Sequence, residues 1–230
     1  MSLVLGLEVT PRVVRGAFLR TTLRGSEMEQ YAEAPLSSST ADTPEPNALR
    51  TAVAQVLSKG ARPPDRIIAS LSGEAASLRL MDLPAGVEKK VAEVLPGELE
   101  AVLPFDIADA VVDYQVVGRD DLNIRIMAVA APRQNVASRL YALQSAGADP
   151  RELAVGAAAF DGLGALLGES LGSRTVLVID VGSKSTDFAM LSNGICTFAR
   201  TISGGCLLYT SDAADEDCLV EGWGGAGGWG

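Results

Sequence analysis

Two groups of short apolar segments separated by tight turns constrain the fold of this 230-residue chain more than any other feature. The first group covers residues 3–34 and predicts three strands, followed by an amphipathic helix over 48–59. The second group covers residues 175–202 and predicts three more strands. A helix rich in small residues is expected between the two groups, over 157–171. A β-meander that recurs after a connecting helix indicates a duplicated α/β unit.

An insertion between the two groups is predicted by the hydrophobic spacing. Apolar residues recur every three or four positions over residues 87–103 and again near 136–147, which is the spacing of amphipathic helices. The segments that we interpret as strands cover residues 66–72, 77–83, 111–117 and 124–130. We therefore expect a small insert here, entered by the strand pair 66–72 and 77–83 and ordered β-α-β-β-α from the second of those strands.

The composition excludes several classes of function. Nineteen basic residues stand against 29 acidic ones, and aromatic residues make up only 5% of the chain. A nucleic-acid surface needs a basic stripe or stacking aromatics, so we expect no nucleic-acid partner. The chain contains no histidine, which excludes Ser-His-Asp and Cys-His nucleophiles and histidine-ligated metals. We recognise neither a signal peptide nor an uncharged apolar run of membrane-spanning length, so we expect a cytoplasmic protein.

The C-terminal segment, residues 206–230, differs from the rest of the chain. Residues 206–216 read like the translation of a sequencing-library adapter, and residues 217–230 are rich in glycine and contain both tryptophans. We expect residues 206–230 to be artefactual and disordered, with the natural sequence interrupted near Gly205; a natural glycine-rich tail is the alternative. Without this segment one cysteine remains, Cys196, and it has no disulfide partner.

The stretch that starts at Asp180 has the most chemical content. An apolar strand leads to Asp180, and Gly182 lets the backbone turn sharply and come close to a ligand. Hydroxyl and backbone donors follow at Ser183, Ser185 and Thr186. These residues are typical of a hairpin that cradles phosphate, with the carboxylate holding Mg²⁺ or a water. An ordinary hairpin with polar turn residues is the alternative interpretation.

With this order of elements, the sequence resembles the actin-like ATPase superfamily, whose fold is ribonuclease H-like. It is most similar to the bacterial branch that contains FtsA, the type IV pilus assembly protein PilM and the cytoplasmic part of the type II secretion protein GspL. The most specific resemblance is a helix, a Pro-Phe pair and a strand, over residues 98–107 and 112–116. Residues 198–205 resemble the strand and Gly-Gly turn that follow the family's second phosphate loop.

The resemblance implies how the chain is divided. Residues 1–65 and 149–174 would form the first actin-like subdomain, and residues 66–148 an inserted SHS2-type subdomain. Residues 175–205 would begin the second actin-like subdomain, so the α/β actin-like fold would be incomplete at its C-terminus.

The family's first phosphate loop has the pattern D-x-G-x-x-x-x-K, from which this sequence departs. Glu8 stands at the aspartate, Thr10 at the glycine and Arg15 at the lysine. Glu8 could still reach Mg²⁺ through water and Arg15 could still face phosphate; a degenerate loop that binds no nucleotide is the alternative. The resemblance implies ATP as the ligand, with Mg²⁺ at Asp180. The implied nucleotide-binding residues are Asp180, Gly182, Ser183, Ser185, Thr186, Gly204, Gly205, Glu8, Thr10 and Arg15.

The function that the resemblance implies is a scaffold at the inner membrane, part of the assembly platform of a type IV pilus or a type II secretion system. Such a protein would bind ATP structurally, with at most weak ATPase activity. Its partners would be the cytoplasmic tail of an inner-membrane pilus or secretion protein, further copies of itself in a ring, and a secretion or pilus ATPase. The alternatives are an FtsA-like cell-division protein and an actin-fold sugar or acetate kinase.

Overall fold

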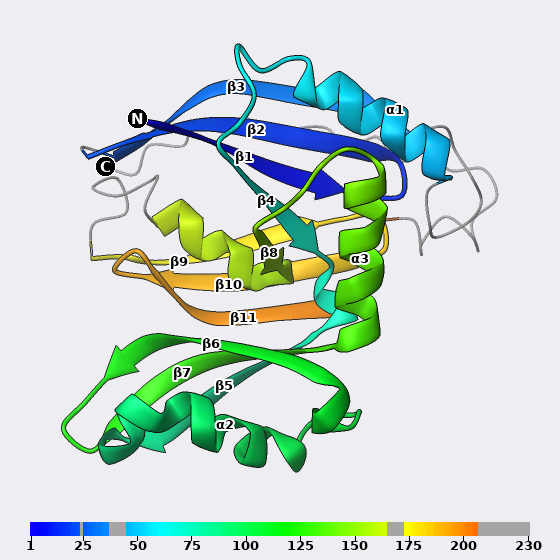
Figure 1. Ribbon diagram of the computed structural model, residues 1–230. Helices are drawn as coiled ribbons and strands as arrows, with labels where there is room; N and C mark the ends of the chain where they lie inside the picture. Colours follow the sequence, from blue (N-terminus) through cyan, green and yellow to red (C-terminus); the bar gives the residue numbers. More distant parts are fainter. Residues whose placement is uncertain (24, 37–44, 165–172, 207–230) are drawn as a thin grey trace.

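The computed structural model describes residues 1–23, 25–36, 45–164 and 173–206, which form three β-sheets with helices around them (Figure 1). The largest sheet has the strand order β3-β2-β1-β4-β8. Its strands are β1 (Ser2–Val9), β2 (Val13–Thr22), β3 (Gly25–Pro35), β4 (Arg66–Leu71) and β8 (Glu152–Val155). The first three form the expected antiparallel meander, whereas β4 pairs parallel with β1, and β8 pairs parallel with β4.

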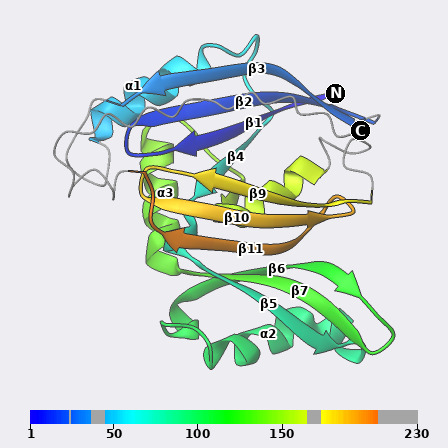
Figure 2. The same ribbon diagram turned by 180° about the vertical axis from the view of Figure 1, so that it is seen from behind.

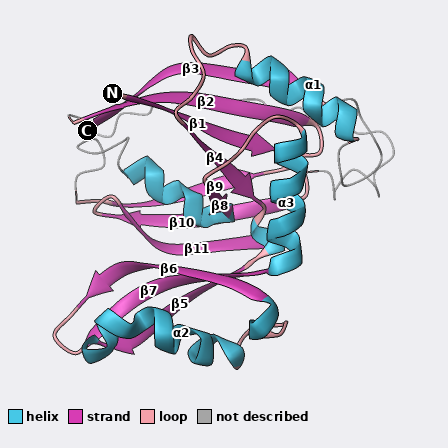
Figure 3. Cartoon of the chain, viewed as in Figure 1, coloured by secondary structure: helices cyan, strands magenta, loops and turns pink. Residues whose placement is uncertain are grey.

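One face of this sheet is covered by two helices, α1 (Pro46–Leu57) and α3 (Arg133–Ser145) (Figure 3). Alternate residues of β1 are buried on that face because side chains of a strand point to opposite sides. The core residues from β1 and from the two helices are Leu3, Leu5, Leu7, Leu49, Ala52, Val53, Val56 and Leu143. Helix α1 begins where the Glu45 carboxylate accepts the N–H of Ala48, at 2.9 Å.

The small subdomain has its own sheet and core. Strands β5 (Ser77–Pro84), β6 (Ala110–Arg119) and β7 (Asn123–Pro132) pair antiparallel in the order β5-β7-β6. Helix α2 (Val91–Glu100) covers one face of this sheet and continues through Pro96, as the phase of the apolar residues predicts. The core between helix and sheet contains Leu83, Val91, Leu95, Leu99, Ile124 and Ile126.

The boundaries expected for the inserted subdomain, 66–148, differ from the observed pairing at both ends. Strand β4 lies between β1 and β8 in the five-stranded sheet, so the small sheet begins only at Ser77. Leu143, near the end of α3, is buried in the core of the five-stranded sheet. The apolar pattern of a strand predicts that it is buried but not which strand it pairs with. The division into subdomains otherwise stays a prediction.

The third sheet is the second expected meander. Strands β9 (Thr175–Val181), β10 (Ser185–Ser192) and β11 (Ile195–Ser203) pair antiparallel in the order β11-β10-β9. One face packs on the 3-10 helix η4 (Gly156–Phe160), which starts the helix expected over 157–171. Residues 165–171 of the expected helix lie outside the described residues, as do residues 207–230 of the expected artefactual tail. In the part of the chain that is described, no helix has both the length and the apolar character that crossing a membrane requires.

Candidate functional site

Two turns at the ends of β1 and β9 contain eight of the ten predicted site residues, and the other two, Gly204 and Gly205, follow β11. We call residues 8–15 the first turn and residues 180–186 the second turn. Strands β1 and β9 both run toward the side of the molecule on which α3 lies, and the front and back views agree on this (Figures 1 and 2). The two turns therefore lie at corresponding ends of two different sheets.

The second turn is closed by the chain that follows β11. The N–H of Gly182 donates to the carbonyl of Ser185 at 2.9 Å, within the turn itself. The N–H of Gly204 then donates to the carbonyl of Lys184 at 2.9 Å, and the N–H of Cys206 donates to the carbonyl of Gly182 at 3.0 Å. The structure therefore brings the Gly-Gly segment onto the second turn, and it uses three of the nearby backbone donors inside the protein.

Two of the three predicted glycines of this cluster, Gly182 and Gly205, are required by close backbone contacts. A Cβ at Gly205 would lie 2.4 Å from the carbonyl oxygen of Gly182 and 2.6 Å from the backbone nitrogen of Lys184. A Cβ at Gly182 would lie 2.8 Å from the carbonyl oxygen of Ser185. The hydroxyl of Thr186 donates to the carbonyl of Gly204 at 2.6 Å, so Thr186 fixes the Gly-Gly segment on the turn.

Two carboxylates stand opposite each other on β9 and β10, next to the second turn. Asp180 is exposed, and its partner in the strand register is Asp187. Partial burial raises the pKa of the Asp187 carboxyl; the hydroxyl of Thr201, which donates to it, acts in the opposite direction, and the nearby Asp180 charge raises the pKa further. Sequence analysis missed Asp187 as a site residue, because its contact with Thr201 depends on the pairing of β10 with β11.

Thr201 also marks the place where the third sheet meets the first. A Cβ at Gly73, in the short 3-10 helix η1 (Gly73–Ala75) after β4, would collide with the Thr201 side chain. A Cβ at Gly156, which follows β8, would lie 2.6 Å from the Cα of Gly73 and 2.8 Å from the Thr201 hydroxyl. The short helices that follow β4 and β8, η1 and η4, therefore pack closely against β11 at Thr201, whose hydroxyl donates to Asp187.

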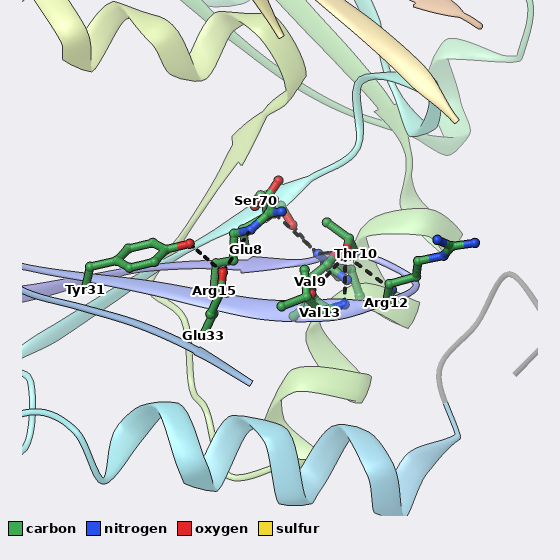
Figure 4. A network of polar contacts seen from close by, with 10 residues as sticks. Glu8, Val9, Thr10, Arg12, Val13, Arg15, Tyr31, Glu33 and Ser70 are labelled. Carbon is green, nitrogen blue, oxygen red and sulfur yellow. Dashed lines mark hydrogen bonds and ion pairs between the residues drawn. The ribbon is translucent and has the colours of Figure 1, made fainter. Parts of the chain in front are cut away.

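The charged residues of the first turn are paired with each other. Arg15 Nη1 donates to Glu8 Oε2 at 3.0 Å across the β1–β2 pair, and Arg15 Nε lies 3.8 Å from Glu33 Oε2 (Figure 4). The hydroxyl of Tyr31 donates to the same Glu33 oxygen at 2.9 Å. The hydrogen bond to Glu8 raises the pKa of Arg15. Glu8 and Arg15 are thus brought together, and each already has a counterion.

Thr10 closes the first turn with its own side chain. Its hydroxyl oxygen accepts the N–H of Val13 at 3.0 Å and the N–H of Arg12 at 3.3 Å (Figure 4). The same hydroxyl donates to the carbonyl of Val13 at 2.9 Å. Threonine at the glycine position therefore gives a turn whose donors are used internally. Thr10, which the sequence analysis noted as a departure from the family pattern, thus produces a turn that is closed by its own hydrogen bonds.

Sequence analysis missed Arg139, a cation on α3 that lies beside the first turn. Arg139, on α3, donates from Nε to the carbonyl of Ser70 at 2.9 Å and from Nη2 to the carbonyl of Val9 at 3.1 Å. It is largely buried, and burial lowers its pKa. In the sequence it is one polar position of an amphipathic helix, and only the packing of α3 against β1 and β4 reveals its place.

The resemblance implies a magnesium nucleotide, so the side chains near the two turns should include ligands for Mg²⁺. Over the described residues, no three or more acidic or cysteine side chains gather in a way that could hold a metal ion. Mg²⁺ in nucleotide sites is commonly held by one or two carboxylates, with waters and phosphate oxygens as its other ligands. The exposed Asp180 fits that role, whereas the Glu8 carboxylate is occupied by Arg15.

Comparison with known families connects this geometry to a group of proteins. Residues 6–216 match the family described as type IV pilus assembly protein PilM, which is most of the chain. The chain belongs to this family. The resemblance to the PilM/GspL-type proteins is therefore confirmed, and so is the expected α/β actin-like fold.

Solved structures agree with the family match. A chain of the PilM-PilN type IV pilus biogenesis complex aligns with a TM-score of 0.73 and 25% identity, over 90% of this chain and 63% of that one. The cytoplasmic domain of EpsL, an inner-membrane component of the type II secretion system of Vibrio cholerae, aligns with a TM-score of 0.55 and 16% identity, over 88% of this chain and 71% of that one. This chain thus spans less than two thirds of the length of the chain in the PilM-PilN complex.

Proposed function

We propose that this chain acts as a PilM-type scaffold in the assembly platform of a type IV pilus, at the cytoplasmic face of the inner membrane. The observation that supports the proposal best is the match of residues 6–216 to PilM, together with the alignment to the PilM-PilN complex. The likeness to EpsL extends to the fold, so a type II secretion platform is the second candidate. Neither comparison favours an FtsA-like protein or a sugar or acetate kinase.

The proposed partner is the cytoplasmic tail of a PilN-type membrane protein. The PilM-PilN complex supports this choice, since its chain aligns with 90% of this one. Further copies of the chain in a ring and a pilus or secretion ATPase complete the proposed assembly.

Mg-ATP is the proposed ligand of the two turns, and Asp180 would hold the metal directly or through water. The hydroxyls of Ser183 and Ser185 would face the phosphates. ATP would act as a structural ligand, with at most slow turnover, because the Glu8 carboxylate is paired with Arg15 and is not free to activate a water. Mg²⁺, when bound, would neutralise part of the phosphate charge.

A binding experiment with the whole chain tests the scaffold proposal. A fluorescently labelled peptide with the sequence of a PilN cytoplasmic tail is titrated with the chain, and anisotropy is recorded with and without Mg-ATP. Saturable binding is expected, and a peptide of the same composition in scrambled order should not bind. Equal binding of the two peptides, or of neither, would contradict the proposed partner.

A further inference from the structure

The guanidinium of Arg139 is fixed at the carboxyl ends of two parallel strands. Nε donates to the carbonyl of Ser70 at 2.9 Å, and Nη2 donates to the carbonyl of Val9 at 3.1 Å and to the Ser70 hydroxyl at 3.4 Å. Val9 ends β1, and Ser70 is the last residue but one of β4. Three contacts from two nitrogens therefore set the orientation of the planar group.

The third nitrogen of Arg139 has no partner among the described residues. The hydrogen bonds of this side chain come from Nε and Nη2, which leaves both N–H groups of Nη1 unused. In the described part of the chain, no buried side-chain nitrogen or oxygen is without a hydrogen bond. Since Nη1 makes none, it must retain contact with solvent. Arg139 thus presents two free donors on a guanidinium that is otherwise held rigidly.

The charge of Arg139 also lacks a direct counterion in the part of the chain that the structure describes. The pKa of the group is lowered by burial, and Glu8, acting at longer range, raises it. An arginine keeps its proton at neutral pH even so. Glu8 is itself paired with Arg15 at 3.0 Å, so the positive charge of Arg139 is stabilised chiefly by the dipoles of the two carbonyl groups that it contacts. A partly buried cation with this environment favours an incoming anion.

We propose that Arg139 Nη1 is the phosphate contact of the first turn and takes the role that the sequence analysis assigned to Arg15. This inference rests on the proposed function, in which a phosphate-bearing ligand binds beside the first and second turns. The location supports it, because ligands of open α/β sheets bind outside the carboxyl ends of the parallel strands. Arg15, by comparison, is occupied by Glu8 and lies within 3.8 Å of Glu33.

Calorimetric titration of the whole chain with two probes, Mg-ATP and inorganic tripolyphosphate, tests the proposal. Arg139→Gln should weaken the binding of both probes by about tenfold to a hundredfold, the usual effect of losing a charged hydrogen bond. Arg15→Gln should change either affinity by less than about threefold, since that charge is already neutralised. Arg133→Gln is the matched control on the same helix; its Nη2 donates to the carbonyl of Ala110, away from the turn.

Arg139→Lys keeps the test decisive if Arg139→Gln fails to fold, which thermal melts would reveal. Lysine retains the charge but cannot bridge both carbonyls and contact an anion at once, so tripolyphosphate binding should still fall by at least about fivefold. Unchanged tripolyphosphate binding in a folded Arg139 variant would overturn the inference, as would the absence of tripolyphosphate binding by the wild-type chain. Arg139-dependent tripolyphosphate binding without any Mg-ATP binding would uphold the anion contact and contradict the nucleotide proposal alone.

Discussion

The first and second turns hold corresponding places at the ends of β1 and β9, yet they are closed by different means. The first turn is held by side chains, namely the Glu8–Arg15 ion pair and the Thr10 hydroxyl. The second turn is held by backbone contacts with the Gly-Gly segment after β11, and its acidic residue, Asp180, stays exposed. The difference teaches that turns at corresponding strand ends can be closed in different ways, one as a self-neutralised hairpin and the other with an open carboxylate.

The largest effect is expected from a glycine substitution in the Gly-Gly segment that closes the second turn. Gly205→Ala should lower the free energy of unfolding by about 1–3 kcal/mol, because its Cβ would meet backbone atoms at 2.4–2.6 Å. Gly6→Ala, in β1, is the matched control; its Cβ would be no nearer than 3.8 Å to the carbonyl oxygen of Ala17, so the protein should be as stable as the wild type or slightly more stable. Urea denaturation measures both. Equal midpoints for Gly205→Ala and wild type would contradict the tight backbone contact.

Mg-ATP affinity is expected to depend on the acid of the second turn and not on the acid of the first. Asp180→Asn removes an exposed carboxylate while keeping its shape, and it should weaken Mg-ATP binding by roughly 1–3 kcal/mol. Glu8→Gln should have little effect, since that carboxylate already faces Arg15. Titration of a fluorescent ATP analogue into the two variants compares them directly. If both variants bound as the wild type does, the second turn would be only a hairpin.

The order of elements and the helical phases were predictable from the sequence, because alternation and three- or four-residue spacing are local properties. The partner of β4 was not, since pairing depends on distant strands. The residue types at Glu8, Thr10 and Arg15 indicated a changed first turn. Their mutual contacts required the register of β1 on β2, and Arg139 required the packing of α3. Whether the predicted residues bind nucleotide stays a prediction.

Acid titration should change stability in opposite directions through two carboxylates, Asp65 beside the start of β1 and Asp187 beside the second turn. The pKa of Asp65 is lowered by its hydrogen bond from Arg62 and by the N–H of Leu3 at the start of β1. Asp65 therefore stabilises the fold above its unfolded pKa of about 3.9, and this is lost as the pH falls toward the lower folded value. The pKa of Asp187 is raised chiefly by burial, so folding gains stability as the pH falls through that raised value toward about 3.9.

Urea denaturation between pH 2 and pH 7 measures these two contributions with the variants Asp65→Asn and Asp187→Asn. With Asp65→Asn as the reference, the wild type should lose stability as the pH falls below about 3.9. With Asp187→Asn as the reference, the wild type should gain stability as the pH falls toward about 3.9. If both carboxylates changed the stability in the same direction as the pH falls, burial would not be the main influence on the pKa of Asp187.

The smallest effect is expected for the ion pair of the first turn. A double-mutant cycle with Glu8→Gln and Arg15→Gln should give a coupling energy of about 0.2–1 kcal/mol, since both side chains are more than 40% exposed. Added salt should reduce the coupling further. The same cycle in 1 M NaCl is the control. A coupling that exceeds this range and resists salt would mean that the pair is shielded from water.

Helix α3 is bonded at its beginning to the small subdomain and in its middle to the five-stranded sheet. Arg133 donates to the carbonyl of Ala110 on β6, and Asn135 donates to the carbonyl of Ala75, just before β5. Arg139 holds the strand ends, and Leu143 is embedded in the larger core. Thirteen residues of helix span about 20 Å, so a tilt of about 5° displaces one end by roughly 2 Å relative to the other. Because Arg139, near the middle of the helix, is bonded to the ends of β1 and β4, a rotation of the small subdomain would move the two ends of α3 in opposite directions and leave the guanidinium in place.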